Sequence, residues 1–232
     1  MANPYFRFKQ FTVYHDQCAM KVGTDGVLLG AWVESTNSTR VLDIGAGSGL
    51  VSLMIAQRSL AQIEAIDIDE DACIQSVVNF RNSPFSDRIK GYCSSLQDFS
   101  PTHQYDLIVS NPPFFSTSLK SSNIQRNIAR HNDLLSREDL FSNTKRLLCP
   151  KGIFCLIVPI DQYASIAGVA EENKFFPKRK TVVFPTPESK PKRILLEYTS
   201  EQVSCIEDKI TIETSRHIYS EEFTRLTCDF YL

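Results

Sequence analysis

Long apolar runs are missing from this sequence. The longest, IFCLIV at 153–158, is far shorter than the ~20 apolar residues that a helix needs to cross a bilayer. The opening stretch also lacks the basic-then-apolar layout of a signal peptide. We therefore expect a protein of the cytoplasm that binds no membrane.

Metal-binding spacing is missing as well. The seven cysteines include no C-x-x-C pair, which disfavours zinc and predicts that no metal is bound. An odd and dispersed set of cysteines is typical of reduced thiols in a cytoplasmic protein rather than of a disulfide framework.

Neither sign of charge dominates, since 25 Lys and Arg stand against 27 Asp and Glu for a formal net charge of −2. This balance excludes a uniformly polybasic protein, although it leaves room for a local basic patch. Internal repeats and low-complexity tracts are also missing. With 42% hydrophobic residues in a chain of 232, we expect one domain with a sizeable core, made of an N-terminal extension (1–35) and a main part (36–232).

From residue 40 onward, apolar strand-like segments alternate with helical ones. Buried strands flanked by helices on short loops favour an α/β fold with a mostly parallel sheet covered on both faces. The last strands follow one another without a helix, which indicates an antiparallel pair at one edge. The expected strands are 40–45, 62–68, 88–93, 105–111, 152–158, 182–184, 193–199 and 209–214, and the expected helices are 49–58, 70–82, 137–148 and 161–173.

The N-terminal part has its own pattern. Residues 5–14 alternate between apolar and polar side chains, as a hairpin does. A helix is then expected to begin near Thr24 or Asp25 and to turn its apolar residues inward.

A glycine-rich turn, Asp43-Ile44-Gly45-Ala46-Gly47-Ser48-Gly49, follows the first strand of the main part. Three glycines in five residues allow a sharp turn and a close approach of the backbone to a ligand. Leu50 takes the position of the last glycine in the dinucleotide pattern G-x-G-x-x-G, which disfavours a nicotinamide-dependent dehydrogenase. The Asp43 carboxylate is placed to meet a cationic ligand.

The next strand ends in Asp67-Ile68-Asp69. In open α/β sheets, ligands bind outside the carboxyl ends of the strands, and a carboxylate at this distance from the glycine turn accepts hydrogen bonds from a ribose diol. The alternative is that these acidic residues only stabilise the start of the next helix. We accept that alternative for Glu70 and Asp71 but not for Asp67.

A third strand end carries Ser110-Asn111-Pro112-Pro113-Phe114. Two prolines stiffen the turn and fix the Asn111 amide and the neighbouring carbonyl groups. Planar acceptors beside an aromatic ring suit a flat substrate that bears an NH2 group. Alone, the motif is equally compatible with an ordinary proline-rich turn, but its occurrence with the other two strand ends, in this order, favours a binding site.

The segments VLDIGAGSG, AIDID and SNPPF resemble the class I S-adenosylmethionine-dependent methyltransferases, in the subgroup that methylates planar amino groups. The opening FRFKQFTVYHDQCAMKVGTDGVLLGAW and the closing CDFYL are similar to the bacterial valine-tRNA (adenine-37-N6)-methyltransferases. The resemblance implies a Rossmann-like fold whose seven-stranded, mostly parallel sheet has an antiparallel edge pair, with a hairpin and helix as the N-terminal extension. It also implies S-adenosylmethionine as cofactor, tRNA as partner, and N6-methylation of adenine 37 in valine tRNA.

The resemblance further implies which residues bind the cofactor. The methionine portion would lie against the glycine turn and be closed in by the start of the first helix, and the adenosine would lie between the second and third strand ends. Many relatives carry an acidic residue after the third strand, where this chain has a serine. The implied cofactor residues are Thr24, Gly26, Asp43, Gly45, Gly47, Asp67, Ile68, Ser95, Leu96 and Asn111.

Catalysis would rest on the NPPF turn. The amine of a nucleobase is a weak nucleophile because its lone pair is delocalised into the ring. If the Asn111 side-chain oxygen and the Pro112 carbonyl accept its two N–H groups, the nitrogen can pyramidalise and its developing positive charge is stabilised. Phe114 would stack on the base, Phe115 is a weaker candidate, and no histidine, His131 included, is assigned as a general base.

Charge is segregated along the chain. Residues 174–193 hold seven basic residues and one acidic residue, and 116–137 hold four and one, whereas 61–71 hold five acidic residues and no basic one. Basic clusters guide nucleic-acid phosphates, although a solvated surface loop has the same composition. The candidate RNA-binding residues are Lys178, Arg179, Lys180, Lys190, Lys192, Arg193, Arg126 and Arg130.

Three other functions remain open at this level. Methylation of ribosomal RNA guanine at N2 uses similar NPPF turns. Methylation of protein glutamine fits less well, because its turn usually ends in tyrosine and the basic segments would have no role. A nucleotide- or RNA-binding module without catalysis would not need a rigid amine-accepting turn.

Overall fold

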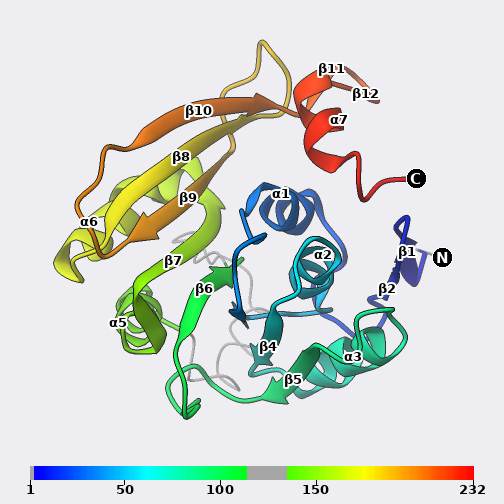
Figure 1. The fold of residues 1–232 in the computed structure, drawn as a ribbon. Coiled ribbons are helices and arrows are strands. Elements are labelled where there is room, and N and C mark those ends of the chain that lie inside the picture. The colour runs from blue at the N-terminus through cyan, green and yellow to red at the C-terminus, as the bar shows by residue number, and fades with distance from the viewer. Residues whose placement is uncertain (1–2, 114–134) are drawn as a thin grey trace, which may run out of the picture.

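The computed structural model describes residues 3–113 and 135–232, with an eight-stranded sheet at its centre (Figure 1). The strand order is β10-β8-β9-β7-β6-β3-β4-β5. The strands are β3 (Arg40–Ile44), β4 (Gln62–Asp67), β5 (Ile89–Cys93), β6 (Tyr105–Ser110), β7 (Leu148–Pro159), β8 (Phe176–Phe184), β9 (Arg193–Thr199) and β10 (Ile206–Thr211).

Among the described residues, four helices connect strands of this sheet, one precedes it in the chain and one follows it. Three begin at side-chain caps, in which Asp69, Ser136 and Ser220 each accept a hydrogen bond from a backbone N–H three residues later. The helices are α1 (Thr24–Trp32), α2 (Leu50–Arg58), α3 (Glu70–Arg81), α5 (Arg137–Leu147), α6 (Tyr163–Glu172), preceded by the 3-10 turn η1 (Ile160–Gln162), and α7 (Glu221–Thr227).

One strand of the sheet runs against the others. β9 pairs antiparallel with both β7 and β8, while β10 pairs parallel with β8. The α/β fold with a mostly parallel sheet is therefore confirmed. The reversed strand lies inside the sheet rather than at its edge, because β9 inserts between β7 and β8. β10 is an eighth strand beyond the seven that the resemblance implies. β10 is mostly exposed, as an edge strand with only one neighbour is.

The two faces of the sheet bury different helices. Alternate residues of β3 point to opposite faces, so that Val41 packs with α1, α2 and α3, and Leu42 packs with α5 and α6. α7 joins the first group, since Phe223 belongs to the same cluster. Figure 1 shows the sheet between these two layers of helices.

The N-terminal hairpin packs against the C-terminal residues. β1 (Tyr5–Arg7) and β2 (Thr12–Tyr14) pair antiparallel, as the alternation at 5–14 predicts. In the turn that connects these strands, Lys9 N donates a hydrogen bond to the Phe230 carbonyl at 2.8 Å, and the Phe8 ring stacks on Tyr231. The remaining short hairpin, β11 (Glu213–Ser215) with β12 (Ile218–Tyr219), lies before α7. Both ends of the chain therefore meet on the face that carries α1 and α7 (Figure 1).

Candidate functional site

A cavity of about 390 Å³ opens at the carboxyl ends of β3, β4 and β6. Its volume lies within the roughly 300–1,000 Å³ of small-molecule sites. Most of its walls come from the strand ends that the sequence singles out, together with a segment that follows β2. The lining residues are Cys18, Ala19, Met20, Ile44, Gly45, Gly47, Ile66, Asp67, Ile68, Asp69, Ala72, Ser94, Ser95, Leu96, Gln97, Asn111, Pro113 and Leu135.

The glycine turn requires glycine for two different reasons. Gly45, Gly47 and Gly49 have φ angles of +70°, +54° and +80°, a region that other L-residues rarely adopt. A Cβ on Gly45 or Gly47 would meet nothing within 4 Å, whereas a Cβ on Gly49 would lie 2.3 Å from Cε1 of Phe80 in α3. The first two glycines thus keep the cavity wall bare, and the third lets the turn pack directly on α3.

Asp67 links the turn to the end of β4. Its Oδ2 accepts from Gly47 N at 2.8 Å, and its Oδ1 accepts from Asp69 N at 3.0 Å. The cap of α3 is supplied by Asp69, whose side chain accepts from Ala72 N. Asp67 therefore has no capping role and presents a fixed carboxylate to the cavity.

Asp43 lies outside the cavity lining. It is 1% exposed, and its Oδ2 accepts from Ser52 N at 3.1 Å and from Ser52 Oγ at 2.7 Å. These bonds cap α2, whose N-cap residue, Gly49, has no side chain to do so. Burial raises the pKa of Asp43 from 3.8 to about 6, and the nearby Asp67 adds to the rise, while the bonds from Ser52 oppose it.

The start of α1 is also set apart from the cavity. Thr24 is exposed, and Gly26 is buried against α2, where a Cβ would lie 3.0 Å from Cδ2 of Leu50. Neither residue lines the cavity. From the N-terminal part, the cavity is lined instead by Cys18, Ala19 and Met20, which sequence reasoning missed. Their only signal was their position inside the N-terminal segment that carries the resemblance.

Cys18 is the thiol of the cavity wall. Burial raises its pKa to about 11, and Asp67 and Asp69 add to the rise. The thiol is therefore neutral near pH 7 and supplies no thiolate nucleophile.

Asn111 brings an unusual polar atom to the cavity. It follows β6, whose last residue, Ser110, donates from Oγ to the Ile44 carbonyl at 3.0 Å and so ties β6 to β3. The Asn111 Oδ1 is buried and has no hydrogen-bond partner among the described residues. A buried acceptor left without a donor costs about 1–3 kcal/mol, and such groups persist where a ligand supplies the donor.

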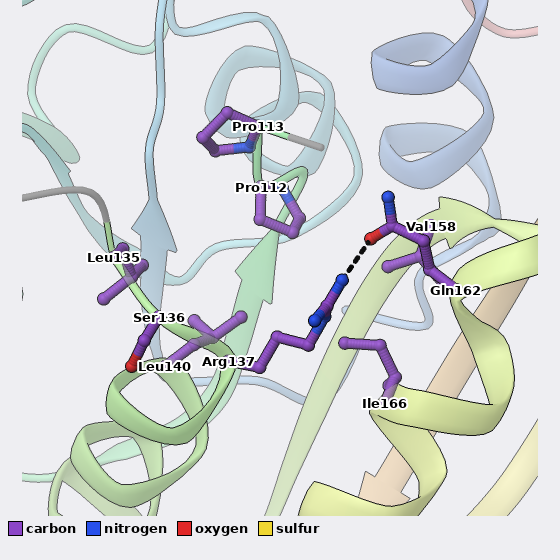
Figure 2. A pocket seen from close by; sticks show the side chains of 9 residues that line it. All are labelled: Pro112, Pro113, Leu135, Ser136, Arg137, Leu140, Val158, Gln162 and Ile166. Atoms are coloured by element: carbon purple, nitrogen blue, oxygen red, sulfur yellow. Dashed lines mark hydrogen bonds between the residues drawn. The ribbon is translucent and has the colours of Figure 1, made fainter. Parts of the chain in front are cut away.

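The prolines after Asn111 also line a second, much smaller pocket (Figure 2). This pocket, of about 10 Å³, is bounded by Pro112, Pro113 and the facing parts of α5 and α6. Figure 2 shows the side chain of Arg137, the first residue of α5, pointing to Gln162, to which it donates a hydrogen bond at 3.2 Å. The pocket is too small for a base. Phe114, Phe115 and His131 lie outside the described residues.

The candidate RNA-binding residues fall into two groups. Lys178 and Arg179 lie in the first half of β8, nearer the end of the strands that is opposite the cavity. Both contact the buried Glu197, at 2.8 and 2.9 Å. Lys180 binds Glu207 at 2.8 Å. The Arg179 guanidinium also lies 3.8 Å from the centre of the Trp32 ring.

The second group lies at the same end of the strands as the cavity, where Arg193 pairs in register with Pro159 at the end of β7. Arg193 contacts Asp25 at 2.8 Å, and the exposed Lys190 and Lys192 precede it in the loop between β8 and β9. Arg126 and Arg130 lie outside the described residues.

Across residues 3–113 and 135–232, the structure has no group of three or more His, Cys, Asp or Glu side chains that could hold a metal ion. Within the same ranges, no helix is long and apolar enough to span a membrane.

The buried Asp43 predicts how stability depends on pH. Because its pKa is higher in the folded chain than in the unfolded one, the folded chain holds the proton more tightly, and this group's contribution to the free energy of unfolding falls as pH rises from about 4 to 6. The isosteric Asp43→Asn side chain does not titrate, so the variant should gain stability relative to the wild type as pH rises from about 4 to 6. Urea unfolding at several pH values measures the difference; a wild type that loses stability relative to the variant on acidification would contradict the raised pKa.

Comparison with known proteins agrees with this geometry. Residues 18–158 match the family model described as methyltransferase small domain. Proteins named tRNA1(Val) (adenine(37)-N6)-methyltransferase from Parabacteroides distasonis and Phocaeicola vulgatus are 51% and 50% identical to the chain, covering 100% of it and 99% of their own lengths.

Solved structures share the fold at low sequence identity. A predicted O-methyltransferase from Agrobacterium tumefaciens has a TM-score of 0.71 at 18% identity, covering 89% of this chain and 96% of its own. A putative S-adenosylmethionine dependent methyltransferase from Listeria monocytogenes has a TM-score of 0.55 at 15% identity, covering 76% and 99%. With the full-length relatives, these similarities show that the chain belongs to the methyltransferase small domain family and to the tRNA1(Val) (adenine(37)-N6)-methyltransferases.

Proposed function

We propose that this chain transfers a methyl group from S-adenosylmethionine to the N6 amine of adenine 37 in the anticodon loop of valine tRNA. Relatives that carry this activity in their names match the chain from end to end. The observation that carries the chemistry is the buried Asn111 Oδ1, an acceptor without a partner among the described residues, beside a cavity of cofactor size.

The cavity fits the cofactor by its chemistry. Asp67 presents a fixed carboxylate for the two ribose hydroxyls, and the half-exposed Ile68 offers an apolar surface to the adenine. Bare backbone at Gly45 and Gly47 leaves room for the methionine portion. When bound, the cofactor supplies an electrophilic methyl group on a sulfonium ion.

Ser95 and Leu96 also line the adenosine side of this cavity. The Ser95 hydroxyl donates to Asp98 at 2.7 Å, so an acidic residue does stand behind the serine that replaces the usual acid. We propose that Ser95 and Leu96 border the cofactor adenine, with Asp98 fixing the serine hydroxyl.

The NPP turn acts on the substrate amine. The Asn111 Oδ1 and the Pro112 carbonyl accept its two N–H groups, which turns the nitrogen lone pair out of conjugation and toward the methyl group. Positive charge that develops on nitrogen is stabilised by these oxygens, whose orientation the prolines fix before the reaction. After transfer the nitrogen is acidic, and its proton leaves to water. Phe114, outside the described residues, would stack on the base, a role that stays a prediction.

We propose that the phosphates of the tRNA bind at the same end of the strands as the cavity. Lys190 and Lys192 are exposed there. Lys178 is exposed too, but it pairs with Glu197, and Arg179 and Lys180 are also paired with carboxylates, nearer the opposite end of the strands. We therefore assign phosphate binding to Lys190 and Lys192, with Arg126 and Arg130 as candidates outside the described residues. Arg193 supports the same loop through Asp25.

Incubation with labelled cofactor and unmodified total tRNA, followed by nucleoside analysis, tests the function directly. The expected product is N6-methyladenine, and it should vanish when valine tRNA carries guanine at position 37. Recovery of methylguanine, or methylation of ribosomal RNA alone, would contradict the assignment.

Substitution of Asn111 should separate chemistry from binding. Asn111→Ala removes an acceptor that acts mainly as charge develops, so single-turnover methylation of saturating tRNA should slow by about 10²–10³, by analogy with oxyanion donors. Cofactor affinity, measured by calorimetry, should stay close to the wild-type value. Asp67→Ala is the control and should show the opposite pattern, because it removes the ribose acceptor. A near-wild-type rate for Asn111→Ala would exclude the amine-acceptor role.

The two groups of basic residues should differ in their effect on tRNA binding. Removing one cation that binds a phosphate flattens the log–log salt dependence by about 0.7–0.9, so Lys190→Gln with Lys192→Gln should weaken binding and flatten the slope. Lys178→Gln with Lys180→Gln removes the same charge and should leave the slope unchanged, because those side chains are engaged with Glu197 and Glu207. A wild-type slope for Lys190→Gln with Lys192→Gln would show that the loop between β8 and β9 does not bind phosphate.

A further inference from the structure

Asn79 is a fully buried amide that joins three parts of the fold. It lies near the end of α3 and is 0% exposed. Its Nδ2 donates to the Tyr14 carbonyl and to the Ser48 carbonyl, both at 2.8 Å, and its Oδ1 accepts from Tyr14 N at 2.9 Å. One side chain therefore ties α3 to the end of β2 and to the glycine turn.

Each backbone group that Asn79 holds lies next to the cavity wall. Ser48 stands between Gly47, whose N–H binds Asp67, and Gly49, which packs on Phe80. On the other side, Tyr14 ends β2 and leads directly into residues 15–20, which include Cys18, Ala19 and Met20 of the cavity lining.

A second amide on the same side of α3 supports this arrangement. Gln75, four residues before Asn79 and 4% exposed, accepts from Gln17 N at 3.3 Å through its Oε1. Residues four apart lie above one another on a helix, so α3 holds the N-terminal segment at two successive points, Tyr14 and Gln17.

The contacts of α3 with the glycine turn are complementary in kind. The close approach of Gly49 to Phe80 fixes how near the turn lies to α3, and the bond from Asn79 to the Ser48 carbonyl fixes its orientation. Without Asn79, the buried Ser48 carbonyl and the partly buried Tyr14 carbonyl would both lose this donor, which is costly unless the backbone moves to find another. Movement here displaces Gly47 on one wall and Cys18 on the other.

We propose that Asn79 is a positioning residue for cofactor binding, which sets the distance between the glycine turn and segment 15–20 without contacting the cofactor itself. The inference rests on the proposed function, since it takes the cavity to be the site of S-adenosylmethionine. It assigns to α3 a part in shaping the site beyond the acidic residues at its start.

The test compares two substitutions in α3. Asn79→Asp keeps the side-chain shape and the acceptor for Tyr14 N but replaces both donated hydrogen bonds with repulsion between oxygens. Ser76→Ala is the matched control, because Ser76 is 3% exposed and bonds within the helix, to the Cys73 carbonyl. We expect Asn79→Asp to weaken S-adenosylmethionine binding by about tenfold or more and to raise the KM for the cofactor, with kcat at saturating cofactor within a few-fold of wild type. Ser76→Ala should lower at most the thermal midpoint.

The outcomes are separable from those of the proposed function. Failure of the wild type to bind the cofactor would overturn the proposed function and this inference together. Wild-type binding with unchanged affinity in a folded Asn79→Asp variant would overturn the positioning role alone, as would a fall in kcat without a rise in KM. If Asn79→Asp does not fold, Gln75→Ala takes its place: it should weaken cofactor binding by a few-fold, and unchanged affinity there would equally overturn the inference.

Discussion

The hydrogen bond from the Gly47 N–H to the Asp67 carboxylate sets the geometry on which the rest of the site depends. It joins the ends of two neighbouring strands, β3 and β4, and it is reinforced by the bonds from Gly45 N and Ala46 N to the Ile66 carbonyl. Only a glycine turn with positive φ angles can place these N–H groups side by side. From this bond the turn extends on one side to α2, capped by Asp43, and on the other to α3, held by Asn79.

Acidic and basic side chains lie in two different places around the site. The described lining of the cavity contains Asp67 and Asp69 but no basic side chain, with Asp43 buried behind it, which suits a cofactor that carries a sulfonium cation. The exposed lysines that suit an anionic tRNA stand apart, in the loop between β8 and β9. Neither Lys190 nor Lys192 lines the cavity, so these two cations do not face the sulfonium that they would repel; charges a few ångströms apart interact strongly in a partly buried site.

Local patterns were enough to predict the fold class and the strand ends. Strand and helix periodicity, the glycine turn, Asp67 and Asn111 are all legible within a few residues of sequence, and the sheet edge at which they gather follows from parallel pairing. The α/β fold is confirmed, while the site roles stay predictions. The direction of the Asp43 carboxylate depends on Ser52, which the periodicity places in a helix without saying which way it faces.

Partners that are distant in the sequence could not be predicted in this way. In the sequence, the basic run at 178–180 resembles an RNA-binding surface. In the folded chain, β9 and β10 place Glu197 and Glu207 against this run. In the same way, the composition of α3 gives no sign that Asn79 meets Tyr14 and Ser48, because the contacts depend on how the hairpin and the glycine turn pack. The charge and polarity of a residue can be read from the sequence. Whether a charge is paired or an amide is hydrogen-bonded depends on which residues the fold brings together.

The meeting of the chain ends has a consequence for the order of assembly. Lys9 Nζ donates to the Cys228 carbonyl, a contact between residues 219 positions apart, and Phe8 stacks on Tyr231. Contacts of such long sequence separation carry the largest loop-closure cost and form after the local ones. Docking of the hairpin on residues 228–231 is therefore expected late in folding, after β1 and β2 have paired with each other. Segment 15–20, which follows that hairpin, is held separately by α3 through Asn79 and Gln75. The cavity wall can therefore form from contacts of much shorter sequence separation, without waiting for the chain ends to meet.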